Sequence, residues 1–295
     1  MKKTLIGLFS LLCLIGYGQT QQHINKKFST ESNLISDIDS IRFNPDTDEM
    51  EVILKSKEIK KHDISTIKNV TFGSAEATCG ASNVLNPVLS YGSMTDQEGN
   101  SYKTIKIGSQ EWMAENLKTK TYSNGDPVNN VKDSSEWVDA VAGAWCDYDN
   151  QVSFECPYGK LYNWYAVNDS RNLCPAGWHV PSNSEWSTLI NLLDPNADGG
   201  LKTPNFAGGG LKSAGLQYWI FPNSSATNHT GFSALPGGYR VNFFAGINLL
   251  GYWWSSSEQS ATTGWLRYLN LNSATITASN NAKWLGISVR CIKDL

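Results

Sequence analysis

Cysteine is the residue type in this sequence whose chemistry is easiest to assign. Five of the six cysteines follow the N-terminal leader: Cys79, Cys146, Cys156, Cys174 and Cys291. In an oxidising compartment such residues form disulfides, whereas zinc sites favour closely spaced pairs such as C-x-x-C, which this sequence lacks. Cys146 and Cys156 could close a local loop, and Cys174 and Cys291 a long one. Four cysteines already allow three connectivities, so the pairing stays open and Cys79 has no assigned partner.

A second group of residues carries oxygen ligands. Asp194, Asn196 and Asp198 occupy alternate positions before Gly199, as in the first half of a calcium-binding loop. The twelfth position of that loop is Asn205, where a bidentate glutamate is expected. An Asx-rich turn after a helix explains the same pattern without a metal. We therefore expect no cofactor, and a calcium site at the first three residues is the alternative.

Aromatic side chains form the third group. All eleven tryptophans lie between Trp112 and Trp284. Aromatic faces match the apolar C–H faces of sugar rings, so a sugar-binding platform is one interpretation of five of the aromatic residues: Tyr239, Tyr252, Trp253, Trp254 and Trp265. The alternative is that they fill the core, since Trp and Tyr bury large areas. Neighbouring residues of a strand point to opposite faces, so one of Trp253 and Trp254 is expected in the core.

The sequence contains none of the common catalytic motifs. HExxH, the P-loop and the serine-nucleophile motif are all missing. His179 lies directly before a predicted helix and is expected to be structural rather than a general base. The formal net charge is −3 and there is no basic stripe, so nucleic acid is not an expected partner. We expect that the chain is not an enzyme.

The first eighteen residues have the organisation of a secretory signal peptide. A basic start with Lys2 precedes the short apolar run Leu5–Ile15, and small residues allow cleavage after Gly18. This predicts a secreted, periplasmic or cell-surface protein. A lipoprotein acylated at Cys13 is disfavoured because Leu12 stands where a small residue is expected. No later segment is apolar for long enough to cross a membrane.

A change of composition near residue 75 predicts a domain boundary, at the small-polar stretch Gly73–Asn83. Residues 19–75 contain a two-copy pattern, Ile35–Phe43 and Ile64–Phe72, with Glu51–Leu54 between the copies. Each of the three segments is typical of a short strand. The region is expected to be a small β-rich module or spacer, and an adaptor that docks by strand addition is the alternative.

Residues 76–295 predict an α+β domain with two short helices and several short antiparallel strands. The clearer helix follows Ser182, which forms a capping box with Glu185, and it ends at Asp194-Pro195. Its apolar residues fall on one face. The second helix is expected over Lys160–Val167. The predicted strands are Tyr102–Ile107, Tyr252–Ser255, Trp265–Leu271 and Ile287–Ile292, and the predicted glycine-rich turns are Ala207–Gly210 and Pro236–Gly238.

Five sequence blocks resemble a known family. In chain order they are Gln110–Leu117 (QEWMAENL), Tyr158–Ala166 (YGKLYNWYA), Cys174–Trp186 (CPAGWHVPSNSEW), Gly251–Glu258 (GYWWSSSE) and Gly286–Ile292 (GISVRCI). Together they resemble the Fibrobacter succinogenes major paralogous domain, over about residues 96–295. That family consists largely of exported bacterial proteins without an assigned activity.

The resemblance implies, more remotely, the C-type-lectin-like fold of the formylglycine-generating enzyme group. In such folds a cysteine before a helix and one in the last strand are often bridged. Cys174 and Cys291 occupy comparable positions, so the resemblance favours this pair. The motifs by which C-type lectins bind sugar through calcium, Glu-Pro-Asn and Trp-Asn-Asp, are missing from the sequence.

The leading functional interpretation is an exported, non-catalytic binding or surface module that recognises glycan or an envelope protein. The alternative is an enzyme related to the formylglycine-generating group. Such an enzyme needs two nearby reactive cysteines, and Cys146 and Cys156 lie outside the last third of the chain, where that pair is expected. A structural envelope or matrix component, with the N-terminal repeat as its assembly device, is a further alternative.

Overall fold

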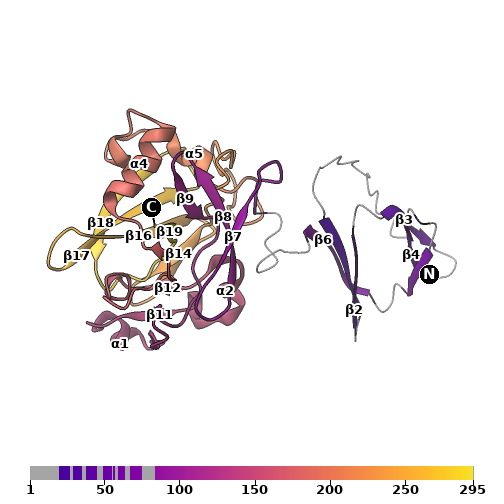
Figure 1. Ribbon diagram of the computed structural model, residues 1–295, viewed down its shortest axis with the longest axis horizontal. Helices are drawn as coiled ribbons and strands as arrows, with labels where there is room; N and C mark the ends of the chain where they lie inside the picture. Colours follow the sequence, from indigo (N-terminus) through magenta and orange to yellow (C-terminus); the bar gives the residue numbers. More distant parts are fainter. Residues whose placement is uncertain are drawn as a thin grey trace, which may run out of the picture. The chain divides into compact units, whose positions relative to one another are not determined.

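In a computed structural model of the chain, the described residues are 20–26, 29–34, 38–44, 49–54, 56, 59–63, 67–74 and 84–294. The chain divides into two compact units, Met1–Ala75 and Glu76–Leu295. Each unit contains its own β-sheets (Figure 1). The predicted signal peptide and Cys79 lie outside the described residues.

The first unit contains two three-stranded antiparallel sheets. Their strand orders are β2-β1-β6 and β3-β4-β5. The strands are β1 (Thr20–Lys26), β2 (Ser29–Leu34), β3 (Ile38–Asn44), β4 (Glu49–Leu54), β5 (Ile59–Asp63) and β6 (Ile67–Ser74). Strands β3, β4 and β6 overlap the three strands predicted from the sequence. The other three are too polar to show the apolar alternation on which such a prediction depends.

The second unit is a mixed α+β domain of short elements, as the sequence predicted. Its helices are α1 (Ser134–Val138), α2 (Glu155–Tyr158), α3 (Trp164–Val167), α4 (Asn183–Leu193) and α5 (Ala207–Leu211). Its strands are β7 (Gly92–Thr95), β8 (Ser101–Ile107), β9 (Gln110–Met113), β10 (Asn129–Asn130), β11 (Ala144–Cys146), β12 (Leu161–Tyr162), β13 (Trp178–His179), β14 (Gly237–Arg240), β15 (Phe244–Ile247), β16 (Leu250–Glu258), β17 (Thr263–Asn270), β18 (Ile276–Ala282) and β19 (Ile292–Lys293).

The antiparallel sheet β16-β17-β18 lies between two hydrophobic clusters. Trp254 and Leu266 belong to one cluster, whereas Trp253 and Leu269 belong to the other, on the opposite face. A second sheet has the order β13-β19-β9-β8-β7, so the last strand of the chain lies between strands from much earlier in the sequence. The C-terminus accordingly ends among the strands of this unit (Figure 1).

Helix α4 forms as its sequence predicts. The Ser182 hydroxyl accepts a hydrogen bond from the Glu185 amide, and the Glu185 carboxylate accepts one from the Ser182 amide. This capping box satisfies amides that would otherwise lack a partner. Trp186, Leu189 and Ile190 are buried on one face, and Asp194 ends the helix. Local chemistry therefore determines both ends of this helix.

The predicted helix over Lys160–Val167 is only half correct. Helix α3 begins at Trp164, because the Asn163 side chain accepts a hydrogen bond from the Ala166 amide and caps it there. The two residues before Asn163 form β12, which pairs with β11. The count of two helices was likewise too low, since the described part of the second unit has five.

The predicted strand over Ile287–Ile292 is also largely wrong. Successive residues of this segment pair with different neighbours and form no continuous ladder. Ile287 bridges to Tyr162, Ser288 bridges to Trp253, and the Val289 carbonyl accepts a hydrogen bond from the Leu117 amide. Only Ile292 belongs to a named strand, β19.

The predicted turn at Ala207–Gly210 is instead the buried helix α5. Its glycines are required by close packing rather than by a turn. A Cβ at Gly208 would lie 2.7 Å from the carbonyl oxygen of Ala274, and one at Gly209 would lie 2.6 Å from that of Ser225. The turn predicted at Pro236–Gly238 is also wrong, because Gly237 and Gly238 are the first two residues of strand β14.

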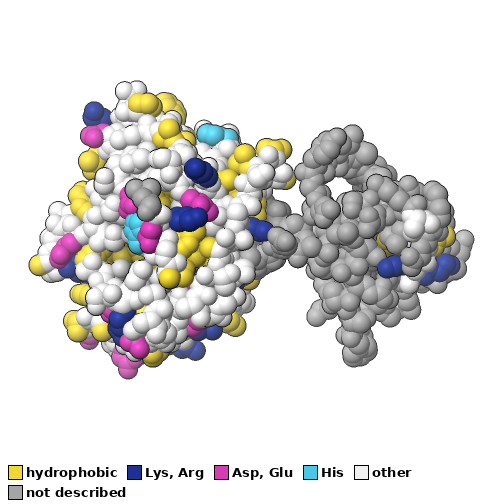
Figure 2. All heavy atoms as spheres, viewed as in Figure 1, with side chains coloured by type: hydrophobic (Ala, Val, Ile, Leu, Met, Phe, Trp, Pro, Cys, Tyr) yellow, Lys and Arg dark blue, Asp and Glu magenta, His cyan; other side chains and the backbone are white. Residues whose placement is uncertain are grey.

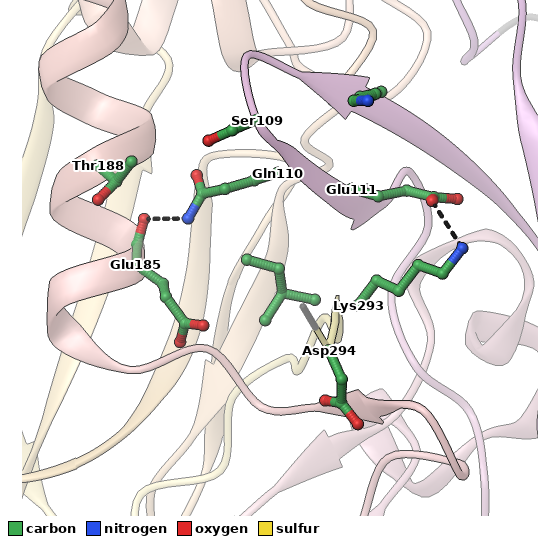
Figure 3. Close-up of a pocket in the computed structure, with 9 residues that line it drawn as sticks. Ser109, Gln110, Glu111, Glu185, Thr188, Lys293 and Asp294 are labelled. Carbon is green, nitrogen blue, oxygen red and sulfur yellow. Dashed lines mark hydrogen bonds and ion pairs between the residues drawn. The ribbon is translucent and has the colours of Figure 1, made fainter.

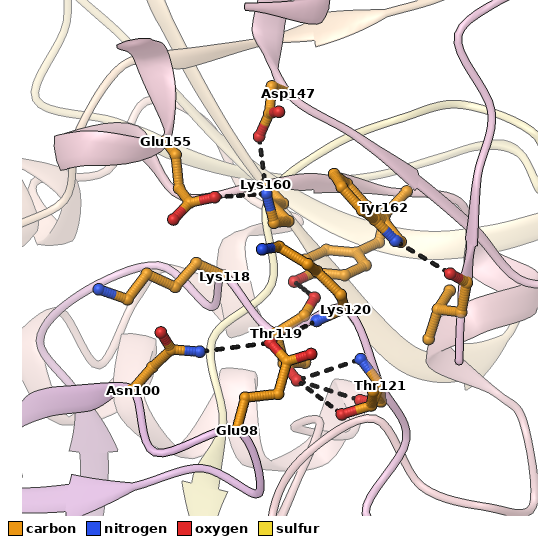
Figure 4. Close-up of polar contacts among 12 residues, drawn as sticks. Glu98, Asn100, Lys118, Thr119, Lys120, Thr121, Asp147, Glu155, Lys160 and Tyr162 are labelled. Atoms are coloured by element: carbon orange, nitrogen blue, oxygen red, sulfur yellow. Dashed lines mark hydrogen bonds and ion pairs between the residues drawn. The ribbon is translucent and has the colours of Figure 1, made fainter. Parts of the chain in front are cut away.

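Buried cations hold the long loops to the sheets. The Lys160 ammonium lies 2.8 Å from Asp147 Oδ1 and 2.5 Å from Glu155 Oε2 (Figure 4). It also lies 4.0 Å from the centre of the Trp145 ring. Lys212, also fully buried, donates to three backbone carbonyls. Each cation supplies hydrogen bonds to carboxylates or backbone carbonyls, groups that would otherwise need water as their partner.

Candidate functional site

Trp253 and Trp254 are core residues. Both are 0% exposed. The Trp253 indole donates to Asn116 Oδ1 at 2.9 Å, and the Trp254 indole donates to the Tyr162 carbonyl at 2.9 Å. The prediction that these two rings contribute to a binding platform is therefore wrong. Strand β16 is covered by hydrophobic clusters on both faces, so Trp253 and Trp254 are both buried although they point to opposite faces.

Three tyrosines from neighbouring strands form a row at the edge of one hydrophobic cluster. Tyr239 lies on β14, Tyr252 on β16 and Tyr268 on β17, and all three are partly buried. The centres of the Tyr252 and Tyr268 rings are 5.4 Å apart and the rings are stacked. The Tyr239 ring meets the Tyr252 ring edge to face at 5.5 Å. We call these three residues the tyrosine row.

The tyrosine row includes two of the predicted platform residues and one that the sequence did not indicate. Tyr268 joins because β17 pairs with β16 in the register that places it opposite Tyr252. Trp265 lies three residues earlier on β17, and therefore on the other face of the sheet. Burial, with smaller effects from Tyr239 and Tyr268, raises the pKa of Tyr252 to about 12. Its hydroxyl is therefore a neutral hydrogen-bond donor at physiological pH.

A separate polar pocket of about 360 Å³ lies where β8, β9, α4 and β19 meet. On the face shown in Figure 2, side chains of both charges gather beside a histidine. Figure 3 shows Glu185 and Thr188 on the α4 side of the pocket and Lys293 and Glu111 on the opposite side. The lining residues are Lys106, Ser109, Gln110, Glu111, Glu185, Thr188, Ile292, Lys293 and Asp294.

His179 lies beside this pocket and is held from both sides. Its Nδ1 is 2.6 Å from Asp294 Oδ1, and its Nε2 is 2.8 Å from Glu185 Oε1. Burial by itself lowers the pKa of His179, but the two carboxylates outweigh that effect and raise it. Because both ring nitrogens have carboxylate partners, His179 has no nitrogen left to accept a proton from a nucleophile. Its geometry is that of a structural link between elements.

The cysteines separate into bridged and free residues. Cys174 and Cys291 form the predicted disulfide across 117 residues. Cys146 is a free, buried thiol, whereas Cys156 is disulfide-bonded, so the predicted pairing of Cys146 with Cys156 is wrong. Burial raises the pKa of Cys146 to about 11, which keeps the thiol protonated and unreactive. The described residues contain no pair of free cysteines.

The predicted calcium ligands lie in the turn after α4. Both carboxylate oxygens of Asp194 accept backbone hydrogen bonds, from Asn196 and from Phe206. Asn196 and Asp198 are exposed. Asp194 thus forms the Asx turn that was the alternative interpretation. In the described part of the chain no three acidic, histidine or cysteine side chains are grouped as metal ligands would be, and no helix is long and apolar enough to span a membrane.

A family model described as the Fibrobacter succinogenes major domain matches residues 105–293. The chain belongs to this family. The match covers the tyrosine row, the Cys174–Cys291 disulfide and the lining of the polar pocket except Asp294. The family's sequence blocks include residues that organise the fold, such as Lys160, Trp254 and Arg290. No curated protein and no solved structure matches the chain.

Proposed function

We propose that this Fibrobacter succinogenes major domain protein is an exported, non-catalytic module that binds glycan at the bacterial envelope. The tyrosine row carries the proposal. Aromatic rings on adjacent strands, partly open to solvent, offer flat apolar faces for the C–H faces of sugar rings. The tyrosine hydroxyls supply hydrogen bonds to sugar hydroxyls.

Export is supported by the leader sequence and by the Cys174–Cys291 disulfide, since such bonds persist in oxidising compartments. We further propose a C-type-lectin-like fold for residues 76–295. In its favour are the α+β composition and the disulfide that joins the segment before α4 to the residue before the last strand. The proposed binding does not use calcium, because the tyrosine row contains no carboxylate.

The test compares glycan binding by the full mature chain and by two variants, Tyr252→Ala and Tyr268→Ala. Immobilised envelope polysaccharides and a glycan array serve as ligands. Each variant is expected to weaken binding by about 10-fold, the loss of one stacking contact of roughly 1 kcal/mol together with its hydrogen bond. Tyr91→Ala is the matched control, because Tyr91 is also partly buried but packs against the other cluster.

Binding that is unchanged in both tyrosine variants would contradict the proposal. So would the absence of binding to every glycan tested. Circular dichroism of the variants shows whether a loss of binding reflects a loss of fold instead.

A further inference from the structure

The polar pocket between β8, β9, α4 and β19 has no part in the proposed glycan binding, because the tyrosine row lies on β14, β16 and β17. Its volume of about 360 Å³ is within the range of small-molecule sites. The walls are held in place. The side-chain amide of Gln110 donates to the Glu185 backbone carbonyl at 3.1 Å (Figure 3). Gln110 Oε1 also accepts a hydrogen bond from the Trp112 indole at 3.3 Å.

The charges around the pocket are mixed and nearly balanced. Lys106 and Lys293 supply two ammonium groups, and Glu111, Glu185 and Asp294 supply three carboxylates. His179 adds a positive charge when protonated, which brings the formal sum to zero. The pocket has no excess of either charge to attract a ligand with a net charge. A neutral ligand that carries one charge of each sign can instead pair each charge with an opposite one on the walls.

Two of these charged groups keep bonding capacity. Lys293 is paired with Glu111 at 3.1 Å, and Glu185 is occupied by His179 and Ser182. The Lys106 side chain is exposed and makes no hydrogen bond with the described residues, although its charge acts on the Glu111 carboxylate opposite it on β9. Asp294 uses Oδ1 for His179, and its Oδ2 accepts no hydrogen bond from the described part of the chain.

The pocket also has an apolar surface. Ile292 lies in its lining directly before Lys293 and Asp294, and because only 2% of this residue is exposed the apolar contact is small. Methylene groups can pack on such a side chain while charged groups at either end reach the walls. The pocket therefore combines an ammonium and a carboxylate oxygen that make no hydrogen bond with the described residues, together with a small apolar contact.

We propose that this pocket binds a small zwitterion, a free amino acid whose ammonium group pairs with Asp294 and whose carboxylate pairs with Lys106. The polar pocket would be a second site, independent of the tyrosine row.

The experiment titrates the mature chain with glycine, β-alanine, γ-aminobutyrate and δ-aminovalerate, followed by NMR chemical shifts or calorimetry. Propylamine and propionate, each with one of the two charges, are the ligand controls. Saturable binding is expected for at least one amino acid and for neither control. The preferred chain length then reports the separation of the two charged groups.

Lys106→Gln and Asp294→Asn are each expected to weaken that binding by about 10-fold, the loss of one charged hydrogen bond. Lys202→Gln and Asp139→Asn, exposed residues outside the pocket, are the matched controls and should leave it unchanged. If Asp294→Asn loosens the fold by releasing His179, Lys106→Gln still tests the proposal, because it removes no side-chain hydrogen bond among the described residues.

The proposal is overturned if no amino acid binds saturably, if single-charge ligands bind equally well, or if Lys106→Gln has no effect. Because the polar pocket and the tyrosine row are separate sites, Lys106→Gln is expected to leave glycan binding unchanged. Failure of one proposal can therefore be told from failure of the other.

Discussion

Arg290 shows what one buried cation does in a domain made largely of loops. It is 0% exposed, and its guanidinium donates to Asn116 Oδ1 at 2.9 Å and to the carbonyls of Phe232 and Ser233. The group also lies 4.3 Å from the centre of the Phe232 ring. These partners are 57 or more residues away in sequence. One side chain thus fastens two distant loops to the segment before the last strand.

At the residue scale we predict that Arg290→Met lowers the free energy of unfolding by about 3 kcal/mol or more. Methionine fills most of the volume but leaves buried acceptors without a donor, each costing roughly 1–3 kcal/mol. Urea unfolding of the variant measures the loss.

Arg171→Met is the matched control for Arg290→Met. Arg171 pairs with Asp126 and Asp169, but its side chain is 40% exposed. A surface ion pair of this kind is worth about 1 kcal/mol or less. Equal costs for the two variants would show that the buried hydrogen bonds of Arg290 contribute little.

At the element scale, His179 links three parts of the domain. It lies on β13, its partner Glu185 lies on α4, and its partner Asp294 directly follows β19. The link adds to three other attachments of this segment: the short pairing of β19 with β13 and β9, the Lys293–Glu111 ion pair and the disulfide at Cys291.

The stability that His179 contributes should depend on pH. The folded-state pKa of His179 is raised above 6.5, so its contribution is full below about pH 6.5 and is lost as pH rises through the raised pKa. Burial raises the pKa of Glu185, but its bonds with Ser182 and His179 outweigh burial and lower the pKa from 4.5. The stability that Glu185 contributes is therefore present above about pH 4.5 and is lost as pH falls through the lowered pKa. The link is therefore strongest between about pH 4.5 and 6.5.

The measurement is the difference in free energy of unfolding between wild type and His179→Gln at pH 5.5 and at pH 9. A larger difference at pH 5.5 is expected. The exposed His229 has no carboxylate partner among the described residues, and His229→Gln should give the same difference at both values. A His179 effect that is constant or grows with pH would refute the assignment.

At the scale of the whole molecule, the Cys174–Cys291 disulfide closes most of the second unit into one loop. It spans 117 residues and joins the segment before β13 to the residue before β19. A loop of this length loses much conformational freedom in the unfolded state when it is closed. Such a closure contributes up to about 5 kcal/mol if this chain restraint is the main effect.

We predict that the double variant Cys174→Ala/Cys291→Ala loses several kcal/mol of unfolding free energy, within that limit of about 5 kcal/mol. Cys146→Ala is the control, because it removes a buried thiol that closes no loop, at a cost of about 1 kcal/mol. Denaturant titration under non-reducing conditions compares them. Alkylation should label Cys146 only after unfolding, and a double variant no less stable than Cys146→Ala would contradict the prediction.

The sequence by itself determined the features that depend on neighbouring residues. The capping box of Ser182 and Glu185 and the stop at Asp194 predict α4 correctly, because each uses contacts within four residues. The family blocks likewise identified the domain and its Cys174–Cys291 bridge. The Asx turn at Asp194 was one of two interpretations of the sequence. The turn is formed by a local hydrogen bond that the Asn196 amide donates to the Asp194 carboxylate.

Only the tertiary structure decided the features that depend on register and on which faces are covered. The pattern of β16 could not show that clusters on both faces bury Trp253 and Trp254. Tyr268 enters the tyrosine row only through its pairing with β16, and the polar pocket unites β8, α4 and the end of the chain. These contacts join residues far apart in sequence, and the packing of the whole domain selects them from many alternatives of similar local energy.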